Sequence, residues 1–173
     1  MKKLMVVVLM VLISSQANAS WNGCRLSESQ RSVLEFSYSY GSEFGIGMTL
    51  AAIAMQESRL GDVNVNIQDP SASPFHITLD KYLRYRGWPD TNYNRNRAAH
   101  NLITDIYSGA HLATEEVLYW YNRHSNVSGH ERWRRTWASY NAGNRWNGSQ
   151  GQTYATSITN NIRHIRECGW INY

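Results

Sequence analysis

Apolar residues recur at helical spacing through most of this 173-residue sequence, and no stretch alternates apolar and polar residues as a half-buried strand would. The clearest predicted helix covers residues 45–60, and Gly61 follows where a glycine commonly ends a helix. Its apolar face consists of Met48, Leu50, Ala51, Ile53, Ala54 and Met55. Ser27 and Gln30 have the spacing of a capping box at the start of a helix over 27–39. We therefore expect a mainly α protein.

The rest of the chain shows further helical segments separated by polar ones. Apolar spacing predicts helices over residues 77–85, 98–123, 130–140 and 154–167, with polar loops over 62–74 and 87–97. Hydrophobic residues make up 42% of the sequence, which is too many for a disordered chain. No internal repeat or linker divides the chain, so residues 20–173 are expected to form a single domain.

The first nineteen residues have the features of a secretory signal peptide. Two lysines precede an apolar run over residues 4–13, and Ala-Asn-Ala at 17–19 resembles a cleavage site. Ten apolar residues are far fewer than the ~20 needed to span a bilayer, so no stable membrane anchor is expected. The prediction is a mature chain that begins at Ser20 and is periplasmic or secreted.

Export changes the interpretation of the two cysteines, Cys24 and Cys168. In an oxidising compartment a lone pair of cysteines is most simply a disulfide, which here would join both ends of the domain. A reactive thiol has no support from a C-x-x-C motif. The six histidines show no metal-ligand spacing, so neither a metal nor another cofactor is predicted.

The charge of the chain argues against a nucleic-acid partner. Basic residues exceed acidic ones by 17 to 13, and loss of the two N-terminal lysines would leave a net charge of +2. A dedicated nucleic-acid binder carries a much stronger basic balance.

Glu57 is the residue best placed for chemistry. It lies one turn after Ile53 and Ala54, so its carboxyl falls on the apolar face of the predicted helix, in the last turn. Burial and the negative end of the helix dipole both disfavour the charged carboxylate, and a carboxylic acid held neutral can act as a general acid. The alternative is an ordinary helix-end glutamate whose head reaches water.

A second distinctive segment is Ser139-Tyr140-Asn141-Ala142-Gly143. Its glycine can take a positive φ and end the preceding helix abruptly, which exposes backbone polar groups and an Asn side chain. Taken alone, the segment is equally well explained as a structural helix cap.

Together these segments resemble the soluble (SLT-type) lytic transglycosylases, a branch of the lysozyme-like superfamily. Glu57-Ser58 matches the Glu-Ser pair of that family, and 105–112 (Asp-Ile-Tyr-Ser-Gly-Ala-His-Leu) resembles its Asn-Ile-x-x-Gly-x-x-x-Leu helix. Residues 139–143 match its Ala-Tyr-Asn-Ala-Gly signature, and Tyr154 follows at the start of the last helix as in the family. The resemblance covers roughly residues 45–165.

The resemblance implies a lysozyme-like helical domain whose long polar loops line a glycan groove. It implies an enzyme, a glycan-cleaving lyase that breaks the MurNAc-β-1,4-GlcNAc bond of peptidoglycan and forms a 1,6-anhydro product. Glu57 would be the single acid and base, and Tyr154 would hold it in place. Tyr140, Asn141 and Gly143 would bind substrate beside it, and Ser58 would be a hydrogen-bond partner of the helix or of a sugar.

One segment departs from the family pattern. The usual Gly-Leu-Met-Gln is replaced by Ser73-Pro74-Phe75-His76, in which Phe75 could supply an apolar wall and His76 could replace the Gln amide. Two alternatives stay open: a lysozyme-type muramidase with a second essential acid, or a catalytically silent peptidoglycan-binding or assembly protein. Glycan strands are the expected partner. By the resemblance, the enzyme would open the wall for a secretion, conjugation or phage-related envelope assembly or for wall turnover, and the sequence does not choose among these roles.

Overall fold

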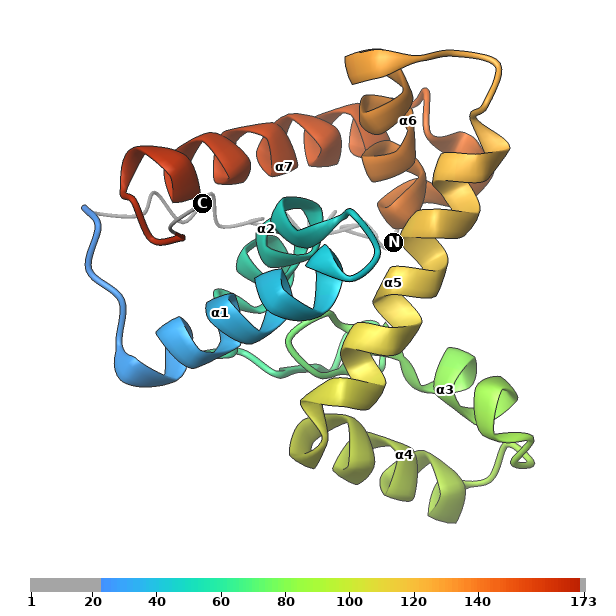
Figure 1. Cartoon of the computed structure of the whole chain (residues 1–173). Helices are drawn as coiled ribbons and strands as arrows, with labels where there is room; N and C mark the ends of the chain where they lie inside the picture. The colour runs from blue at the N-terminus through green and yellow to red at the C-terminus, as the bar shows by residue number, and fades with distance from the viewer. Residues whose placement is uncertain (1–22, 172–173) are drawn as a thin grey trace, which may run out of the picture.

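Seven α-helices make up most of the structure, which is a computed structural model describing residues 23–171 (Figure 1). The helices are α1 (Glu28–Ser42), α2 (Gly47–Ser58), α3 (Leu79–Arg86), α4 (Asn92–Thr104), α5 (Ile106–Arg123), α6 (Gly129–Ala142) and α7 (Ser149–Glu167). The shorter elements are the strands β1 (Val65–Asn66), β2 (Ser71–Ala72) and β3 (Ile77–Thr78) and the 3-10 turn η1 (Gly143–Arg145). The predicted mainly α architecture is confirmed. The expected signal peptide lies outside the described residues.

Helix α2 lies at the centre of the molecule, packed between α1, α7 and α5 (Figure 1). Six consecutive residues, Leu50 to Met55, are buried, so the helix is covered on all sides rather than on the single apolar face that its sequence suggests. Gly41, near the end of α1, lets that helix lie close to the start of α2, because a Cβ on Gly41 would lie 3.0 Å from the Gly47 Cα.

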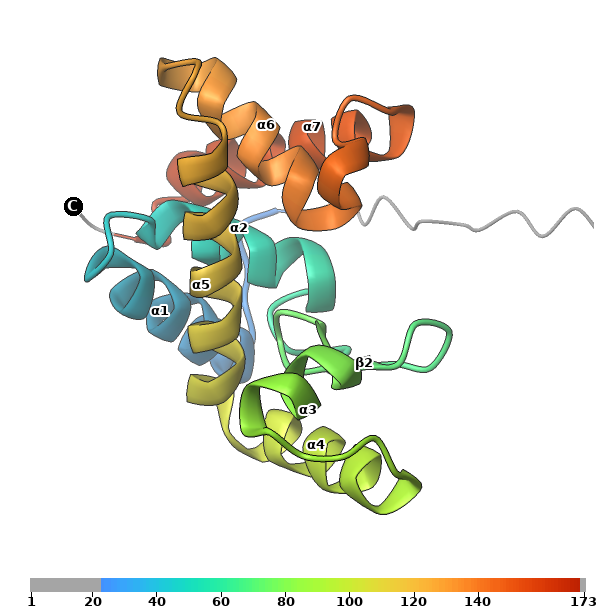
Figure 2. The ribbon, with the colours of Figure 1, turned by 90° about the vertical axis from the view of Figure 1, so that its right-hand side faces the viewer.

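Helix α5 connects two groups of helices, α3 with α4 at one end and α6 with α7 at the other (Figure 2). The sequence predicted one helix over residues 98–123, but Asp105 separates α4 from α5. Its carboxylate accepts hydrogen bonds from the Tyr107 amide at 3.1 Å and from the Ser108 hydroxyl at 2.5 Å. The Asp105 side chain therefore caps α5, because it satisfies an amide that the helix itself leaves free.

Two polar segments contain more regular structure than predicted. The expected loop over 87–97 is wrong in its second half, because α4 already begins at Asn92, where the Thr91 hydroxyl accepts a hydrogen bond from the Asn94 amide at 3.2 Å. Strands β1, β2 and β3 form a small antiparallel sheet between α2 and α3. Two-residue strands are too short to show an alternating pattern, so this sheet cannot be predicted from the spacing of apolar residues.

The ends of the described chain are joined by the predicted disulfide between Cys24 and Cys168, whose Cα atoms are 5.2 Å apart. The Ser27–Gln30 capping box at the start of α1 is also confirmed. Helix α7 begins at Ser149, five residues before the predicted start at Tyr154. Within residues 23–171, no helix combines the length and apolar character needed to cross a bilayer.

Candidate active site

Glu57 is the second-last residue of α2, at the point where the chain leaves the helix. Left-handed backbone begins two residues later, at Arg59 with φ 55°, and continues through Leu60 with φ 59° to Gly61 with φ 88°. Helix α2 therefore ends earlier than its sequence predicts, and two of the three positive-φ positions are not glycine. Such positions are held only where the surrounding structure enforces them.

Ser58 stabilises this turn. Its hydroxyl donates to the Ala54 carbonyl at 3.0 Å and accepts from the Gly61 amide at 2.8 Å, and the residue is fully buried. Ser58 was expected to bond either to the helix or to a sugar, and its hydrogen bonds are to the helix and the turn that follows it. The side chain has no exposed surface for a sugar.

The Glu57 carboxylate is contacted on both oxygens by residues distant in the sequence. The Tyr154 hydroxyl, on α7, donates to Oε1 at 2.5 Å, and the His76 Nδ1, before β3, lies 3.5 Å from Oε2. The Glu57 side chain keeps 19% of its surface exposed. A half-buried carboxyl with two fixed partners and an open side is an arrangement suited to proton transfer.

Tyr154 acts in this arrangement as a neutral hydrogen-bond donor. Burial, and then the negative charge of Glu57, raise the pKa of the Tyr154 phenol well above its usual value of 10. Its ring stacks on Tyr140 with centroids 6.2 Å apart. The phenol therefore stays protonated and is the donor to the ionised Glu57 carboxylate.

The segment Ser73–His76, the one that departs from the family pattern, forms a tight turn under α5. Ser73 has φ 82° and His76 has φ 45°, and the Ser73 carbonyl accepts a hydrogen bond from the His76 amide at 3.1 Å. Gly109 on α5 makes room for this turn, because a Cβ there would lie 2.7 Å from the Ser73 Oγ and 2.8 Å from its Cβ. The turn that carries His76 is therefore packed directly against α5.

His76 is oriented by its second ring nitrogen. The His76 Nε2 lies 2.8 Å from the Val63 carbonyl, which can only accept, so Nε2 carries a hydrogen and Nδ1 faces Glu57. Burial lowers the pKa of His76, but the hydrogen bond to Glu57, the Val63 carbonyl and the charges of Glu57 and Asp69 together raise it above its usual value of 6.5. The charged imidazolium is therefore favoured beside the carboxylate.

The remaining predicted site residues differ in what they present. The Phe75 side chain is 1% exposed and belongs to the core, which corrects the expected apolar groove wall, but its carbonyl accepts from the Tyr140 hydroxyl at 3.2 Å. Asn141 is exposed at the end of α6. Gly143 ends that helix with φ 58°, and a Cβ there would lie 3.9 Å from the Trp120 ring.

A second carboxylate near the tyrosines was not singled out from the sequence. Glu116 on α5 pairs with Lys81 Nζ at 2.5 Å and accepts from the Trp120 indole N–H at 3.4 Å. Burial makes the largest contribution to the raised pKa of Tyr140 and of Tyr154, and the charges of Glu57 and Glu116 add to it in both. In the sequence, Glu116 is a polar position on an amphipathic helix and so resembles an ordinary surface residue.

The other acid near Glu57 in the sequence, Asp62, is directed elsewhere, because its carboxylate accepts from the Gln30 amide at 2.9 Å. Among residues 23–171, no group of three or more His, Cys, Asp or Glu side chains could hold a metal ion.

Comparison with known proteins found no match: no protein-family model, no curated protein and no solved structure is significantly similar to this chain.

Proposed function

We propose that this protein is a peptidoglycan lytic transglycosylase with Glu57 as its single acid and base. The observation that carries the proposal is the Glu57 carboxyl, which accepts from Tyr154 at one oxygen, faces His76 at the other, and is still partly exposed. The sequence resemblance supplies the substrate class: two of the three matching segments contain Glu57 and Tyr140, and Tyr154 follows the third as it does in the family. The chain would act on glycan strands with a lysozyme-like helical domain.

The reaction begins with proton transfer to the leaving oxygen. With the Tyr154 hydroxyl donating to Oε1, the transferable proton of Glu57 is assigned to Oε2, the oxygen nearest His76. Glu57 gives this proton to the bridging oxygen as the bond from C1 of MurNAc to that oxygen breaks. Charge then develops on the MurNAc ring as an oxocarbenium-like state, as in other glycosidic cleavage.

The second half of the reaction restores the acid. The C6 hydroxyl of the same MurNAc attacks C1, and the ionised Glu57 takes the hydroxyl proton. The products are a GlcNAc end with a free hydroxyl and a 1,6-anhydro-MurNAc end, and no water is consumed. One carboxyl suffices, whereas ordinary glycoside hydrolysis uses two.

His76 takes the place of the family's Gln in this scheme. As an imidazolium it donates to Oε2, and after proton transfer within the pair its neutral Nδ1 accepts from the protonated Oε2. The raised pKa of His76 favours the form of the Glu57–His76 pair that holds a proton. The substituted segment is therefore compatible with catalysis.

A lysozyme-type hydrolase is the second candidate, and Glu116 is the observation that favours it. Its charge adds to the raised pKa of the same two tyrosines as the charge of Glu57, so a second carboxylate lies near them. However, Lys81 neutralises Glu116 at 2.5 Å, which weakens it as a nucleophile or base.

Mass spectrometry of the muropeptides released from isolated peptidoglycan tests the proposal. We expect products that are lighter by one water than hydrolytic ones and that lack a reducing end. Hydrated products would establish the muramidase instead. Binding to peptidoglycan without release of fragments would establish the silent wall-binding protein.

A further inference from the structure

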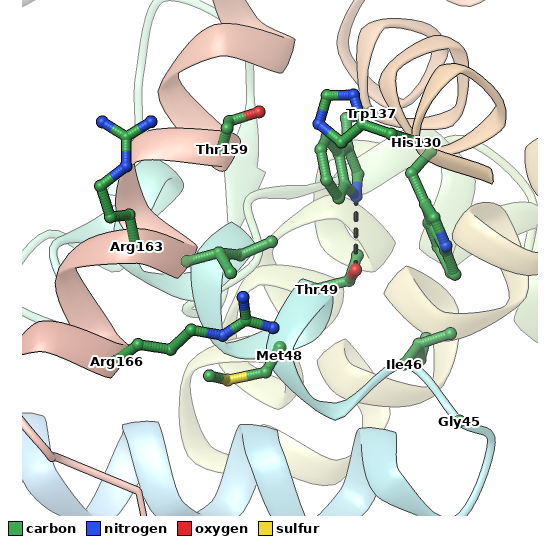
Figure 3. Close-up of a pocket in the computed structure, with 11 residues that line it drawn as sticks. Gly45, Ile46, Met48, Thr49, His130, Trp137, Thr159, Arg163 and Arg166 are labelled. Atoms are coloured by element: carbon green, nitrogen blue, oxygen red, sulfur yellow. Dashed lines mark hydrogen bonds between the residues drawn. The ribbon is translucent and has the colours of Figure 1, made fainter.

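A pocket lies at the opposite end of α2 from Glu57, between the first turn of α2, α6 and α7 (Figure 3). Thr49, which lines it, precedes Glu57 by eight residues, a helix rise of about 12 Å. Its volume is about 430 Å³, which is within the range of sites that bind small ligands or single anchoring side chains. The pocket is therefore distinct from the proposed catalytic site.

The floor of this pocket is apolar and aromatic. The Trp137 indole N–H already donates to the Thr49 Oγ1 at 3.3 Å, so the ring presents only its apolar surface (Figure 3). Trp133 stacks against Trp137 with centroids 6.1 Å apart, and Ile46 and Met48 complete the floor. Such a floor suits a bulky apolar group.

The rim of the pocket is basic. Arg163 and Arg166 are exposed on the face of α7 that lines the pocket, and His130 lies on the opposite side with Trp137 (Figure 3). None of the eleven lining residues is acidic. An occupant that brings carboxylates to this rim would gain complementary charge, and arginine binds carboxylates in a bidentate geometry.

We propose that this pocket is the docking site for an acidic segment of a partner protein, which inserts one bulky apolar side chain between α6 and α7. The hydrogen-bond donors on both sides of the apolar floor are the reason for choosing a peptide. Acidic residues can flank an apolar anchor on both sides, whereas an amphiphile with a single headgroup satisfies only one side. The proposal does not depend on the catalytic activity.

Binding of the aromatic anion 8-anilinonaphthalene-1-sulfonate to the folded mature protein is the first measurement. We expect saturable binding of one dye per chain, weakened about tenfold by Arg163→Glu because an attractive charge becomes repulsive. Arg145→Glu is the matched control, since Arg145 is also exposed but does not line the pocket, and its affinity should stay within twofold. Failure of the dye to saturate, or equal binding by both variants, would overturn the proposal.

Displacement of the dye identifies the occupant. The acetylated peptide Glu-Asp-Phe-Glu-Asp should displace it, whereas Lys-Lys-Phe-Lys-Lys and Glu-Asp-Ser-Glu-Asp should not. Thr159→Phe, which adds a ring at the pocket wall, should reduce binding of dye and peptide alike. Displacement by vesicles of phosphatidylglycerol but not by the acidic peptide would assign the pocket to a lipid and refute the peptide proposal.

Discussion

At the scale of single residues, the candidate site depends on how Glu57 shares protons with its two partners. Tyr154 cannot release its proton near neutral pH, because burial and the Glu57 charge raise the pKa of its phenol. His76 differs from Tyr154, because burial lowers its pKa while its hydrogen bond to Glu57 and the Val63 carbonyl raise it from an ordinary value of 6.5. Changes in protonation around neutral pH therefore concern the Glu57–His76 pair rather than Tyr154.

Substitution of the carboxyl should remove activity without unfolding the protein. For Glu57→Gln we expect a loss of muropeptide release of roughly 10²–10⁴-fold, the usual contribution of a general acid. Circular dichroism and Tm should remain close to those of the unaltered protein. Glu35→Gln, at an exposed glutamate on α1, is the matched control and should keep full activity. Full activity in Glu57→Gln would exclude it as the acid.

The pH dependence should report on His76. Above the pKa of folded His76, the Glu57–His76 pair loses its proton, so we expect muropeptide release to fall as pH rises through that value. His76→Gln keeps a donor that does not titrate, and its pH profile should lack this descending limb. His100→Gln, at an exposed histidine on α4, is the control. An unchanged limb in His76→Gln would assign it to another group.

The same pKa shift has a consequence for stability. Because folding raises the pKa of His76, its protonation stabilises the native state fully below pH 6.5, and this contribution is lost as pH rises through the folded pKa. The difference in Tm between the unaltered protein and His76→Gln should therefore shrink from pH 5.5 to pH 9. A constant difference would contradict the Glu57–His76 interaction.

At the scale of elements, the site requires the turn before β3 to lie directly against α5. Gly109 permits this contact, and the positive φ values of Ser73 and His76 show that the turn is held by its surroundings. The sequence places Gly109 inside a helix, where glycine is unfavourable, and its role becomes visible only in the packed structure.

The Gly109→Ala variant compares the gain in helix propensity with the cost of crowding the turn at Ser73. Alanine has the higher helix propensity, but its Cβ would lie within 2.8 Å of two Ser73 atoms, so we expect a loss of stability of about 1–3 kcal/mol from overpacking. Urea unfolding measures it. Asn160→Ala, at an exposed position of α7, should change the free energy of unfolding by less than about 0.5 kcal/mol. If Gly109→Ala were more stable than the unaltered protein, the turn at Ser73 would have moved away from α5 without cost, which would contradict the prediction.

At the scale of the whole molecule, the Cys24–Cys168 disulfide joins residues 144 positions apart and so closes nearly the whole described chain. A crosslink over a loop of this length restricts the unfolded chain strongly. The Trp170 indole N–H also donates to the Cys24 carbonyl at 2.9 Å, so both ends of the chain are packed together.

Replacement of both cysteines by serine should destabilise the protein by up to about 5 kcal/mol, the chain-entropy value for such a loop. We expect the urea midpoint to fall while the m-value rises, because the unfolded chain becomes more extended. The reduced unaltered protein is the control and should behave like the double variant. An unchanged midpoint would mean that non-covalent packing, without the disulfide, is enough to hold the two ends of the described chain together.

The sequence by itself determined the mainly α architecture, the capping box of α1 and the disulfide partners. These features follow from local spacing, or from there being only two cysteines to pair. The sequence also singled out Glu57 by its place on the apolar helix face, and Tyr140 and Tyr154 through the family resemblance. The division of the predicted helix at Asp105 was missed because its apolar spacing continues on both sides of the cap.

Only the tertiary structure decided which residues meet. The contact of His76 with Glu57 and the burial of Phe75 involve the turn at Ser73 that packs against α5. The proximity of Glu116 to the tyrosines follows from the packing of α5 against α6. These contacts join residues far apart in the chain. Their geometry is set by the close packing of the interior as a whole, to which each residue's own sequence neighbours contribute little.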